Sequence, residues 1–311
     1  MANNKILITG AFGFIGSHVT EFFVEKGLNV VAFDRYNSNN DYGWLKTSKY
    51  KKEINFILGD IRDYDSVYNV MKGCSSCLNL AALIGIPYSY ISPLAYIKTN
   101  VEGTYNVLEA AKNLEIEKII ITSTSETYGT AQYEPMDEKH PLVAQSPYAA
   151  SKISADQLAL SYYRSFDLPL NIIRPFNVYG PRQSTRAIIP TIITQMLNNQ
   201  KKINLGNVEV KRDFTYVKDV CSAFLLALNS SNINGEVINV GMNDNISIND
   251  LFTKISLKLN IKPQIIIDKN RIRKDKSEVI SLKCDNKKII KNLLWKPEYD
   301  ISTGLDQTIS W

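Results

Sequence analysis

The chain of 311 residues has few side chains of the kind that bind metals. It contains two histidines and four cysteines. Cys74 and Cys77 form a C-x-x-C pair, whereas Cys221 and Cys284 are isolated, and this pattern does not suit a closed tetrahedral zinc site. We therefore expect no bound metal, and we expect the cysteines to be reduced thiols with structural roles.

Long apolar segments and blocks of like charge are also missing. Apolar runs such as residues 224–228 are far shorter than the roughly 18 residues of a membrane span. The opening MANNKILITG does not resemble a signal peptide. Basic residues exceed acidic ones by only 36 to 31 and are scattered, unlike a nucleic-acid-binding arm. We expect a cytoplasmic protein without membrane or nucleic-acid partners.

The first half of the chain alternates short apolar segments with helical patterns. The apolar segments are KILITG, NVVAFD, INFILGD, CLNLAA, KIIITS and LPLNIIRPF. Continuously apolar strands separated by helices indicate a parallel sheet that is covered on both faces. The pattern predicts an α/β fold, a Rossmann-type doubly wound sheet with a smaller C-terminal substrate-binding lobe.

The alternation loosens after about residue 180, which suggests a change of domain. We expect a first domain over residues 1–174 and a smaller lobe mainly over 175–311. The segment NGEVINVG is predicted to return to the sheet, so that residues 212–240 rejoin the first domain. The tail DNKKIIKNLLWKP is predicted to be a solvated helix.

Three glycines lie between the first predicted strand and its helix. Gly10, Gly13 and Gly16 give the spacing G-x-x-G-x-x-G, which allows a tight turn and a close approach of a pyrophosphate to the helix N-terminus. Asp34 ends the second strand, where a carboxylate binds the ribose hydroxyls of NAD and repels the extra phosphate of NADP. Arg35 weakens that preference. The pattern predicts an NAD site, and the alternative is an ordinary strand-to-helix turn.

The predicted cofactor contacts extend along this edge of the sheet. Asp60 and Ile61 end the third predicted strand, where the aspartate is placed to accept from the adenine amino group. The alternative for Asp60 is an N-cap for the helix that follows. The remaining predicted contacts lie in the glycine turn and at the end of the fourth predicted strand: Phe12, Phe14, Ile15, Leu80, Ala81 and Ala82.

Tyr148 and Lys152 are four residues apart on a predicted helix and so share one face. A lysine ammonium close to a phenol lowers the phenol pKa and suits it to act as a general base. The run TSTSETYG follows the fifth strand and contains Thr124, Ser125 and Glu126. Glu126 is placed to abstract a proton from carbon, and its alternative is a pairing with a helix N-terminus.

Taken together, these motifs resemble the extended short-chain dehydrogenases/reductases of the nucleotide-sugar epimerase/dehydratase group. The resemblance covers the chain from end to end. The matching segments are GAFGFIG, GDIRD, NLAA, NVEGTYNVLEAA, TSTSETYG, SPYAASK, RPFNVYGPRQ, RDFTYVKDV and WKPEYDISTGL. It implies that NAD binds the first domain, that a nucleotide sugar binds the second lobe, and that the protein is a homodimer built through the helices near Asn100 and Tyr148.

The resemblance also implies roles for single residues. Tyr148 matches the catalytic base, Lys152 the ligand of the cofactor ribose, and Thr124 the hydroxyl that binds the 4-hydroxyl of the sugar. Asn100 matches a buried asparagine counted among the cofactor contacts. The predicted substrate contacts are Tyr88 and Ser89 in the loop IGIPYSYISP, Asn177 and Arg212 as diphosphate contacts, and Arg182, Arg186 and Arg273 as further candidates.

Three reactions share this scaffold: 4,6-dehydration, 4-epimerisation and decarboxylation. Glu126 favours dehydration, because a 4-epimerase needs no second base. Many dehydratases of the group carry Thr-Asp-Glu where this chain has Thr-Ser-Glu, so the acid that replaces the aspartate stays open. The segment QSPYAASKISAD lacks the arginine-rich pattern of UDP-glucuronate decarboxylases.

The fuller run STSETYGTAQYEPMDEKHPL, with GPRQSTR and RKDKSEV, resembles the dehydratases that open legionaminic acid synthesis, and it implies GDP- or UDP-N-acetylglucosamine as substrate. A hydro-lyase with tightly bound NAD is the leading prediction. The alternatives are a 4-epimerase, a UDP-glucuronate decarboxylase, and a protein that binds dinucleotide without catalysis.

Overall fold

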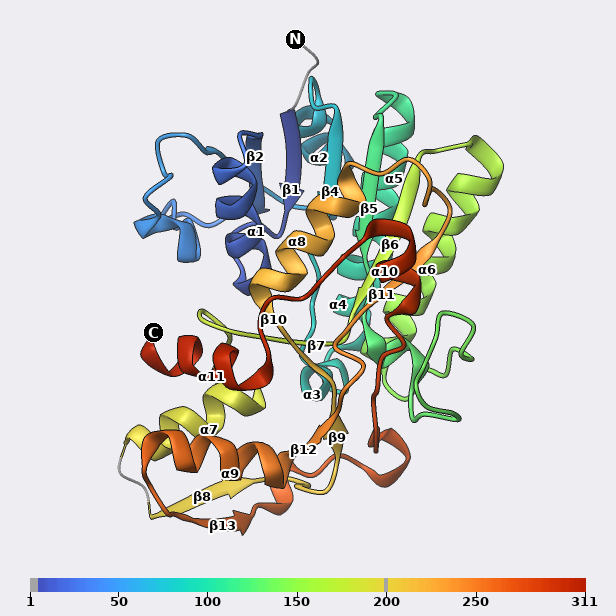
Figure 1. Cartoon of the computed structure of the whole chain (residues 1–311). Coiled ribbons are helices and arrows are strands. Elements are labelled where there is room, and N and C mark those ends of the chain that lie inside the picture. The colour runs from blue at the N-terminus through green and yellow to red at the C-terminus, as the bar shows by residue number, and fades with distance from the viewer. Residues whose placement is uncertain (1–4, 199–200) are drawn as a thin grey trace.

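A seven-stranded sheet lies at the centre of the computed structural model, which describes residues 5–198 and 201–311 (Figure 1). All neighbouring strands run parallel, in the order β11-β6-β5-β4-β1-β2-β3. Their bounds are β1 Lys5–Thr9, β2 Asn29–Arg35, β3 Asn55–Gly59, β4 Ser76–Asn79, β5 Lys118–Thr122, β6 Leu170–Pro175 and β11 Val237–Val240. The order reverses at β1, and the predicted doubly wound fold is confirmed.

Helices cover both faces of the sheet. Helices α2 (Tyr64–Met71), α5 (Gly103–Asn113) and α6 (Pro147–Phe166) pack on one face, and α1 (Phe14–Glu25) and α8 (Val217–Leu228) pack on the other. Because successive strand residues point to opposite faces, Ile6 and Ile8 join one core and Leu7 joins the other. All three side chains are fully buried.

The chain returns to the sheet late. Strand β11 pairs with β6 in parallel, as NGEVINVG predicted, and α8 packs against α1. The smaller lobe, at the bottom of Figure 1, contains α7 (Ile188–Leu197), α9 (Ile248–Leu259), α11 (Ile301–Ser310) and the parallel pair β8 (Lys202–Leu205) and β13 (Gln264–Ile267). The division of the chain at residue 174 stays a prediction.

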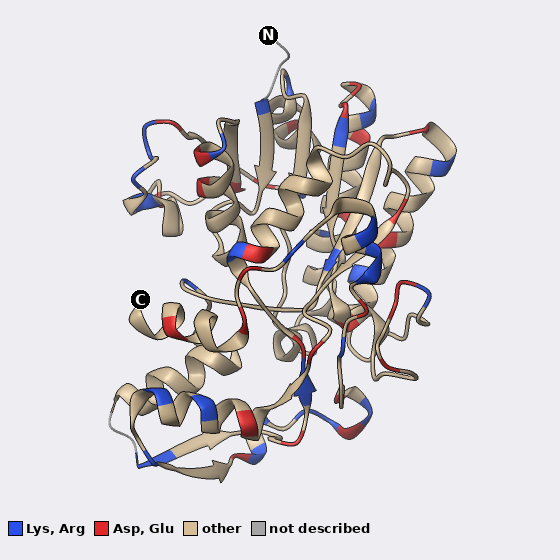
Figure 2. Cartoon of the chain, viewed as in Figure 1, with Lys and Arg blue, Asp and Glu red and all other residues tan. Residues whose placement is uncertain are grey.

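Two short strand pairs lie between the sheet and the smaller lobe. Strand β7 (Asn177–Tyr179) pairs in parallel with β10 (Phe214–Tyr216), and β9 (Lys211–Arg212) pairs antiparallel with β12 (Ile246–Ser247). In the view of Figure 2, basic and acidic segments are interspersed over both lobes. Among the described residues, no helix has the length and apolar character of a membrane span, and no three potential metal ligands gather.

The tail helix differs from its prediction. Helix α10 (Lys287–Leu293) is not fully solvated, because Ile289 and Leu293 are buried against the core. Just beyond it, the Trp295 indole is buried and its Nε1 donates to the Asp219 carbonyl at 3.0 Å. The Asp219 carboxylate in turn accepts from the backbone of Glu298 and Tyr299. The apolar residues between the lysines of this segment thus pack the C-terminal part of the chain onto α8.

A histidine on α1 sets a pH dependence of stability. The His18 Nε2 lies 2.9 Å from the Pro181 carbonyl oxygen, where the neutral ring donates its proton. Burial lowers the pKa of His18 to about 4, from 6.5, and the Pro181 hydrogen bond only partly opposes this effect. The folded state therefore binds a proton at His18 less readily than the unfolded chain does.

We predict that this histidine destabilises the fold in acid. Its contribution is complete above pH 6.5 and is lost as the pH falls toward 4, to a limit of about 3 kcal/mol. His18→Gln keeps a donor for Pro181 and has no proton to bind. Denaturant unfolding of both proteins across this range should show a steeper acid loss for the wild type. Parallel curves for the two proteins would contradict this account.

Candidate active site

The glycine turn leaves no room for side chains at two of its three glycines. Gly10 has φ +67°, and a Cβ on it would lie 2.8 Å from backbone atoms of Ala81. A Cβ on Gly16 would overlap the Gly10 carbonyl oxygen, so only glycine lets α1 start against this turn. Gly13 is the N-cap of α1 and has room for a Cβ, 3.5 Å from the nearest atom. Because Gly13 has no side chain, the space in front of the N-terminus of α1 stays open.

Asp34 lies beside this turn at the end of β2. Its Oδ2 accepts from the Phe12 N–H at 2.8 Å and its Oδ1 from the Arg35 N–H at 2.7 Å. Burial raises the pKa of Asp34 and these two hydrogen bonds oppose the rise. Next to it is a hollow of about 410 Å³, lined by Phe12, Gly13, Asp34, Asn37, Asn39, Asp41 and Gly43.

These features fit a dinucleotide. The exposed N–H groups of a helix N-terminus suit a pyrophosphate, and the carboxylate at the hollow suits ribose hydroxyls. Phe14 and Ile15 lie in the first turn of α1, partly buried against the core. Leu80 and Ala81 adjoin the turn, since both backbone N–H groups donate to the Thr9 hydroxyl at the end of β1. Ala82 follows them as a half-buried residue.

Asp60 and Asn100 have protein partners that the sequence did not reveal. The Asp60 carboxylate pairs with Arg62 at 2.5 Å, which lowers the pKa of Asp60. The N-cap of α2 is Asp63, so the N-cap alternative for Asp60 is wrong. Ile61 is buried. Asn100 exchanges two hydrogen bonds with the Leu83 backbone and donates to Ser151 at 2.9 Å.

Tyr148 lies beside the turn that follows β5. Tyr148 lies in the first turn of α6 and is 7% exposed. The Thr124 hydroxyl is a hydrogen-bond partner of the Tyr148 phenol. The segment Ser125–Tyr128 forms the 3-10 helix η3, with Thr124 as its N-cap. The Ser125 side chain is buried, whereas Glu126 is half-buried and contributes negative charge near the phenol.

Lys152 differs from the expectation in its contact. Its Nζ donates to the Thr122 carbonyl at 2.6 Å, and its side chain is buried. Burial raises the pKa of Tyr148, and the Thr124 hydrogen bond only partly opposes this. The lowered phenol pKa expected from Lys152 is therefore absent in this state, because the lysine charge is directed at the end of β5.

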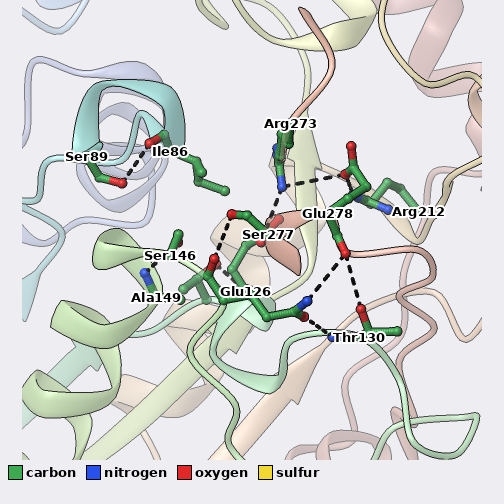
Figure 3. A network of polar contacts seen from close by, with 12 residues as sticks. Ile86, Ser89, Glu126, Thr130, Ser146, Ala149, Arg212, Arg273, Ser277 and Glu278 are labelled. Atoms are coloured by element: carbon green, nitrogen blue, oxygen red, sulfur yellow. Dashed lines mark hydrogen bonds and ion pairs between the residues drawn. The ribbon is translucent and has the colours of Figure 1, made fainter. Parts of the chain in front are cut away.

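Glu126 belongs to a cluster of two carboxylates and two guanidinium groups (Figure 3). Arg273 Nη1 lies 3.7 Å from Glu126 Oε2 and 3.9 Å from Glu278 Oε1. Arg212 Nη2 lies 3.6 Å from the same Glu278 oxygen. The buried Arg273 Nη1 has no hydrogen-bond partner. Sequence reasoning found three of these residues and missed Glu278, whose only signal was its place in the RKDKSEV run.

The other predicted substrate residues are spread around this cluster. Tyr88 is 47% exposed, whereas Ser89 is fully buried and donates to the Ile86 carbonyl. Both belong to the short helix α3 (Ile86–Ser89), where a loop was predicted. The buried Asn177 Oδ1 has no partner. Arg186 is exposed and its charge acts on Tyr96, which packs on Tyr148.

Arg182 is held away from the Tyr148 side of the site. Its Nη2 pairs with Glu21 of α1 at 2.7 Å, on a backbone with φ +70°. The contact ties the GPRQ loop to the helix behind the glycine turn. A substrate contact for Arg182, like those of Ser89 and the other residues above, stays a prediction.

Known proteins are similar to this chain in sequence and in fold. The model of the GDP-mannose 4,6 dehydratase family matches residues 7–308. A putative UDP-glucose 4-epimerase of Methanocaldococcus jannaschii is 34% identical over 98% of this chain and 97% of its own length.

Two solved structures are also similar. The dTDP-glucose 4,6-dehydratase DesIV of Streptomyces venezuelae superposes with a TM-score of 0.90 at 26% identity, covering 99% of this chain and 96% of its own. The UDP-N-acetylglucosamine 4-epimerase of Methanobrevibacter ruminantium gives 0.88 at 30% identity, covering 100% and 98%.

The doubly wound sheet, the bare glycine turn and the Tyr148–Thr124 pair define an extended short-chain dehydrogenase/reductase. The chain belongs, within that class, to the nucleotide-sugar epimerase/dehydratase family that the GDP-mannose 4,6 dehydratase model describes. DesIV was solved with NAD bound, in agreement with the cofactor predicted from the sequence.

We predict that two glycines of the turn fail in different ways. Gly16→Ala places a methyl group on the Gly10 carbonyl, so it should lower both the melting temperature and NAD affinity. Gly13→Ala has room in the fold and should keep the melting temperature, but its methyl would stand at the predicted pyrophosphate position and should weaken NAD binding about 10-fold or more. Thermal melts and calorimetric titration with NAD test the pair. Unweakened NAD binding by Gly13→Ala would place the pyrophosphate elsewhere.

Proposed function

We propose that this protein is an NAD-dependent nucleotide-sugar 4,6-dehydratase, a hydro-lyase that makes a 4-keto-6-deoxy sugar nucleotide. The observation that carries the proposal is the position of Glu126, a half-buried carboxylate in the same turn as the Thr124 partner of Tyr148. In this proposal NAD occupies the first domain, residues 1–174 with 212–240, and the nucleotide sugar occupies the lobe over 175–311.

The first step needs a base and a fixed hydroxyl. Tyr148 takes the proton of the sugar 4-hydroxyl, and Thr124 holds that hydroxyl in line through its own side chain. NAD, when bound, accepts the hydride from carbon 4 and later returns it to carbon 6. Lys152 lies one turn beyond Tyr148 on α6 and supplies a donor for the cofactor ribose. Burial of Tyr148 and Lys152 excludes water during this step.

In the second step Glu126 transfers the proton that leads to the loss of water. Beside the new ketone, the proton on carbon 5 becomes acidic, and the Glu126 carboxylate removes it. The resulting acid gives that proton to the 6-hydroxyl, which leaves as water. Return of the hydride to carbon 6 would leave an enolate, whose carbon 5 takes a proton from solvent, and Tyr148 gives its proton back to solvent. Ser125 is too weak an acid for this transfer and is buried. One residue thus acts first as base and then as acid, so the absent aspartate is not needed.

The lobe supplies the groups that suit a diphosphate. Arg212 and Arg273 approach the site from β9 and from the loop before Val279, and guanidinium groups bind phosphate oxygens in pairs. We propose GDP- or UDP-N-acetylglucosamine as substrate and legionaminic acid biosynthesis as the pathway. Support comes from the Thr124–Glu126 run and from one similar solved structure, which is named as a UDP-N-acetylglucosamine 4-epimerase.

A 4-epimerase is the second candidate. The similarity to two proteins named as 4-epimerases favours it, since both are matched along nearly their whole length. The two reactions share the step at Tyr148 and differ in their need for Glu126. The decarboxylase is a weaker alternative, because the segment QSPYAASKISAD lacks the arginine-rich pattern of decarboxylases. The non-catalytic dinucleotide-binding protein is weaker because it would need none of Tyr148, Lys152 and Glu126.

A homodimer is also part of the proposal. The helical segment that starts at α4 (Pro93–Tyr96) and continues into α5 carries exposed apolar side chains in helical spacing, Leu94, Ile97 and Tyr105. A second copy that packs on this face would remove them from water. The segment lies beside α6, the helix that carries Tyr148.

A mass-spectrometric screen tests the reaction. The protein with NAD meets UDP-, GDP- and dTDP-linked glucose and N-acetylglucosamine, GDP-mannose and UDP-glucuronate. We expect the loss of one water from an N-acetylglucosamine nucleotide, with one solvent deuterium incorporated at carbon 5 in deuterated buffer. An isomer of unchanged mass would instead establish the epimerase, and the loss of carbon dioxide would establish the decarboxylase.

Two variants sharpen the result. Glu126→Gln should lower dehydration roughly 10²–10⁴-fold and abolish deuterium uptake at carbon 5, while oxidation at carbon 4 remains. Tyr148→Phe should abolish both reactions. Full dehydration by Glu126→Gln would remove Glu126 from the mechanism.

We predict a dimer in light scattering at micromolar concentration. Replacing Leu94 and Ile97 with lysine should produce monomers, because like charges would then meet on an apolar face. The matched control is Leu257→Lys on α9, a still more exposed leucine on the smaller lobe, which should leave the mass unchanged. A wild-type monomer would contradict the prediction.

A further inference from the structure

Three polar side chains form a closed ring beneath the site. Asp156 Oδ2 accepts from the Ser123 hydroxyl at 2.5 Å and from Arg174 Nη2 at 3.0 Å. Arg174 Nε donates to the Ser123 oxygen at 3.2 Å and so completes the ring. Asp156 is fully buried and the other two are nearly so. No part of the proposed mechanism uses these residues.

Each member of the ring adjoins a residue that the mechanism does use. Ser123 immediately precedes Thr124. Asp156 follows Lys152 by four residues on α6, as Lys152 follows Tyr148, so all three lie on one face of the helix. Arg174 comes from β6, and its guanidinium also lies 4.6 Å from the ring centre of Tyr128, the last residue of η3. The ring therefore connects both ends of the catalytic turn to the catalytic helix.

The ring contains two charged side chains, Asp156 and Arg174, at buried positions where an unpaired charge would destabilise the fold. A buried carboxylate is tolerated only with a partner, and Arg174 provides it. Only one Asp156 oxygen is used, since the buried Oδ1 has no hydrogen-bond partner. The negative charge of Asp156 is thus left partly uncompensated, four residues from Lys152.

We propose that Asp156, with Arg174 and Ser123, positions the active site: it holds the turn over residues 123–126 against α6 so that Thr124 and Glu126 face Tyr148. The inference rests on the proposed function only as far as the oxidation step at Tyr148, which dehydratases and epimerases share. None of the three is a catalytic residue, because none touches the reacting atoms.

An electrostatic consequence follows from the same geometry. Burial lowers the pKa of Lys152, and Asp156 opposes this by raising it. Asp156 also raises the pKa of Tyr148. The other charged or titratable groups around this face are Arg174 on β6, Glu126 in η3, and Tyr96 in α4. Without the Asp156 charge, both Lys152 and Tyr148 should lose their protons at lower pH.

The decisive variant removes both charges together. Asp156→Asn alone would leave Arg174 buried without a counter-ion, which destabilises a fold, whereas replacing both partners with apolar groups is often neutral. In Asp156→Leu/Arg174→Met we expect a melting temperature close to that of the wild type and a kcat lowered roughly 10–100-fold. Both limbs of the pH profile of kcat should move to lower pH.

Two further proteins separate position from charge. Ser123→Ala opens the ring but keeps the ion pair, so kcat should fall while the pH profile stays in place. The control, Lys258→Gln/Asp306→Asn, removes an ion pair between α9 and α11, far from the site, and should change neither readout. Calorimetric titration with NAD at a series of pH values adds a measurement that does not depend on turnover. The loss of NAD affinity at high pH should begin at lower pH in the double variant.

The kcat, pH profile and melting temperature of these variants decide whether the ring positions the active site. Wild-type kcat and pH profile in a folded double variant would overturn it and leave the ring a packing feature. If the double variant does not fold, Ser123→Ala decides: unchanged kcat overturns the inference, and a loss of kcat at unchanged melting temperature supports it. If the wild type converts no nucleotide sugar, the proposed function fails, and the pH dependence of NAD binding still judges the ring.

Discussion

The site depends on a chain of buried hydrogen bonds that ties the catalytic helix to the strand of the glycine turn. The residues in order are Thr9, Asn79, Thr104, Asn100, Ser151 and Tyr148. The Thr104 and Ser151 hydroxyls each accept from one neighbour and donate to the next, and the chain ends at the Tyr148 backbone carbonyl, so the direction of every bond is fixed. Because an unpaired buried polar group is costly, a shift of α6 relative to β1 would break several such pairings at once.

This coupling explains why the strand ends matter more than the loops. Thr9 ends β1 and Asn79 ends β4, and their register places them opposite each other in the sheet. The Thr9 hydroxyl also accepts the N–H groups of Leu80 and Ala81, which form the wall against Gly10. The same contact therefore shapes the glycine turn and fixes the distance to the helix of Tyr148. Asn100 lies in a π-helical segment between α4 and α5, a distortion that aims its amide at both neighbours.

The sequence predicted what is local and missed what is distant. Strands, the glycine turn and the Tyr148–Lys152 spacing follow from patterns within a few residues, because their periods and turn chemistry are set there. Glu278 reaches Arg212 across 66 positions, and Arg174 reaches Asp156 from another element, so no spacing rule could pair them. The Thr122 contact of Lys152 was equally hidden, since it is a backbone carbonyl that carries no residue signature. Burial, which raises the pKa of Tyr148, is also a property of the packed fold alone.

The two charged assemblies of the site differ in what they can do. The Asp156–Arg174 pair is sealed from water and joined by a contact of 3.0 Å, so it can hold geometry but cannot exchange partners at low cost. The Glu126–Arg273–Glu278–Arg212 cluster has contacts of 3.6 to 3.9 Å, longer than a good charge-assisted hydrogen bond, and it leaves an Arg273 donor unpaired. Its guanidinium groups can therefore take new phosphate partners without breaking strong bonds. The rigid Asp156–Arg174 pair fixes the backbone of the turn that carries Glu126. The loose cluster around the Glu126 side chain lets its charged neighbours rearrange. A residue that must act first as base and then as acid requires both properties.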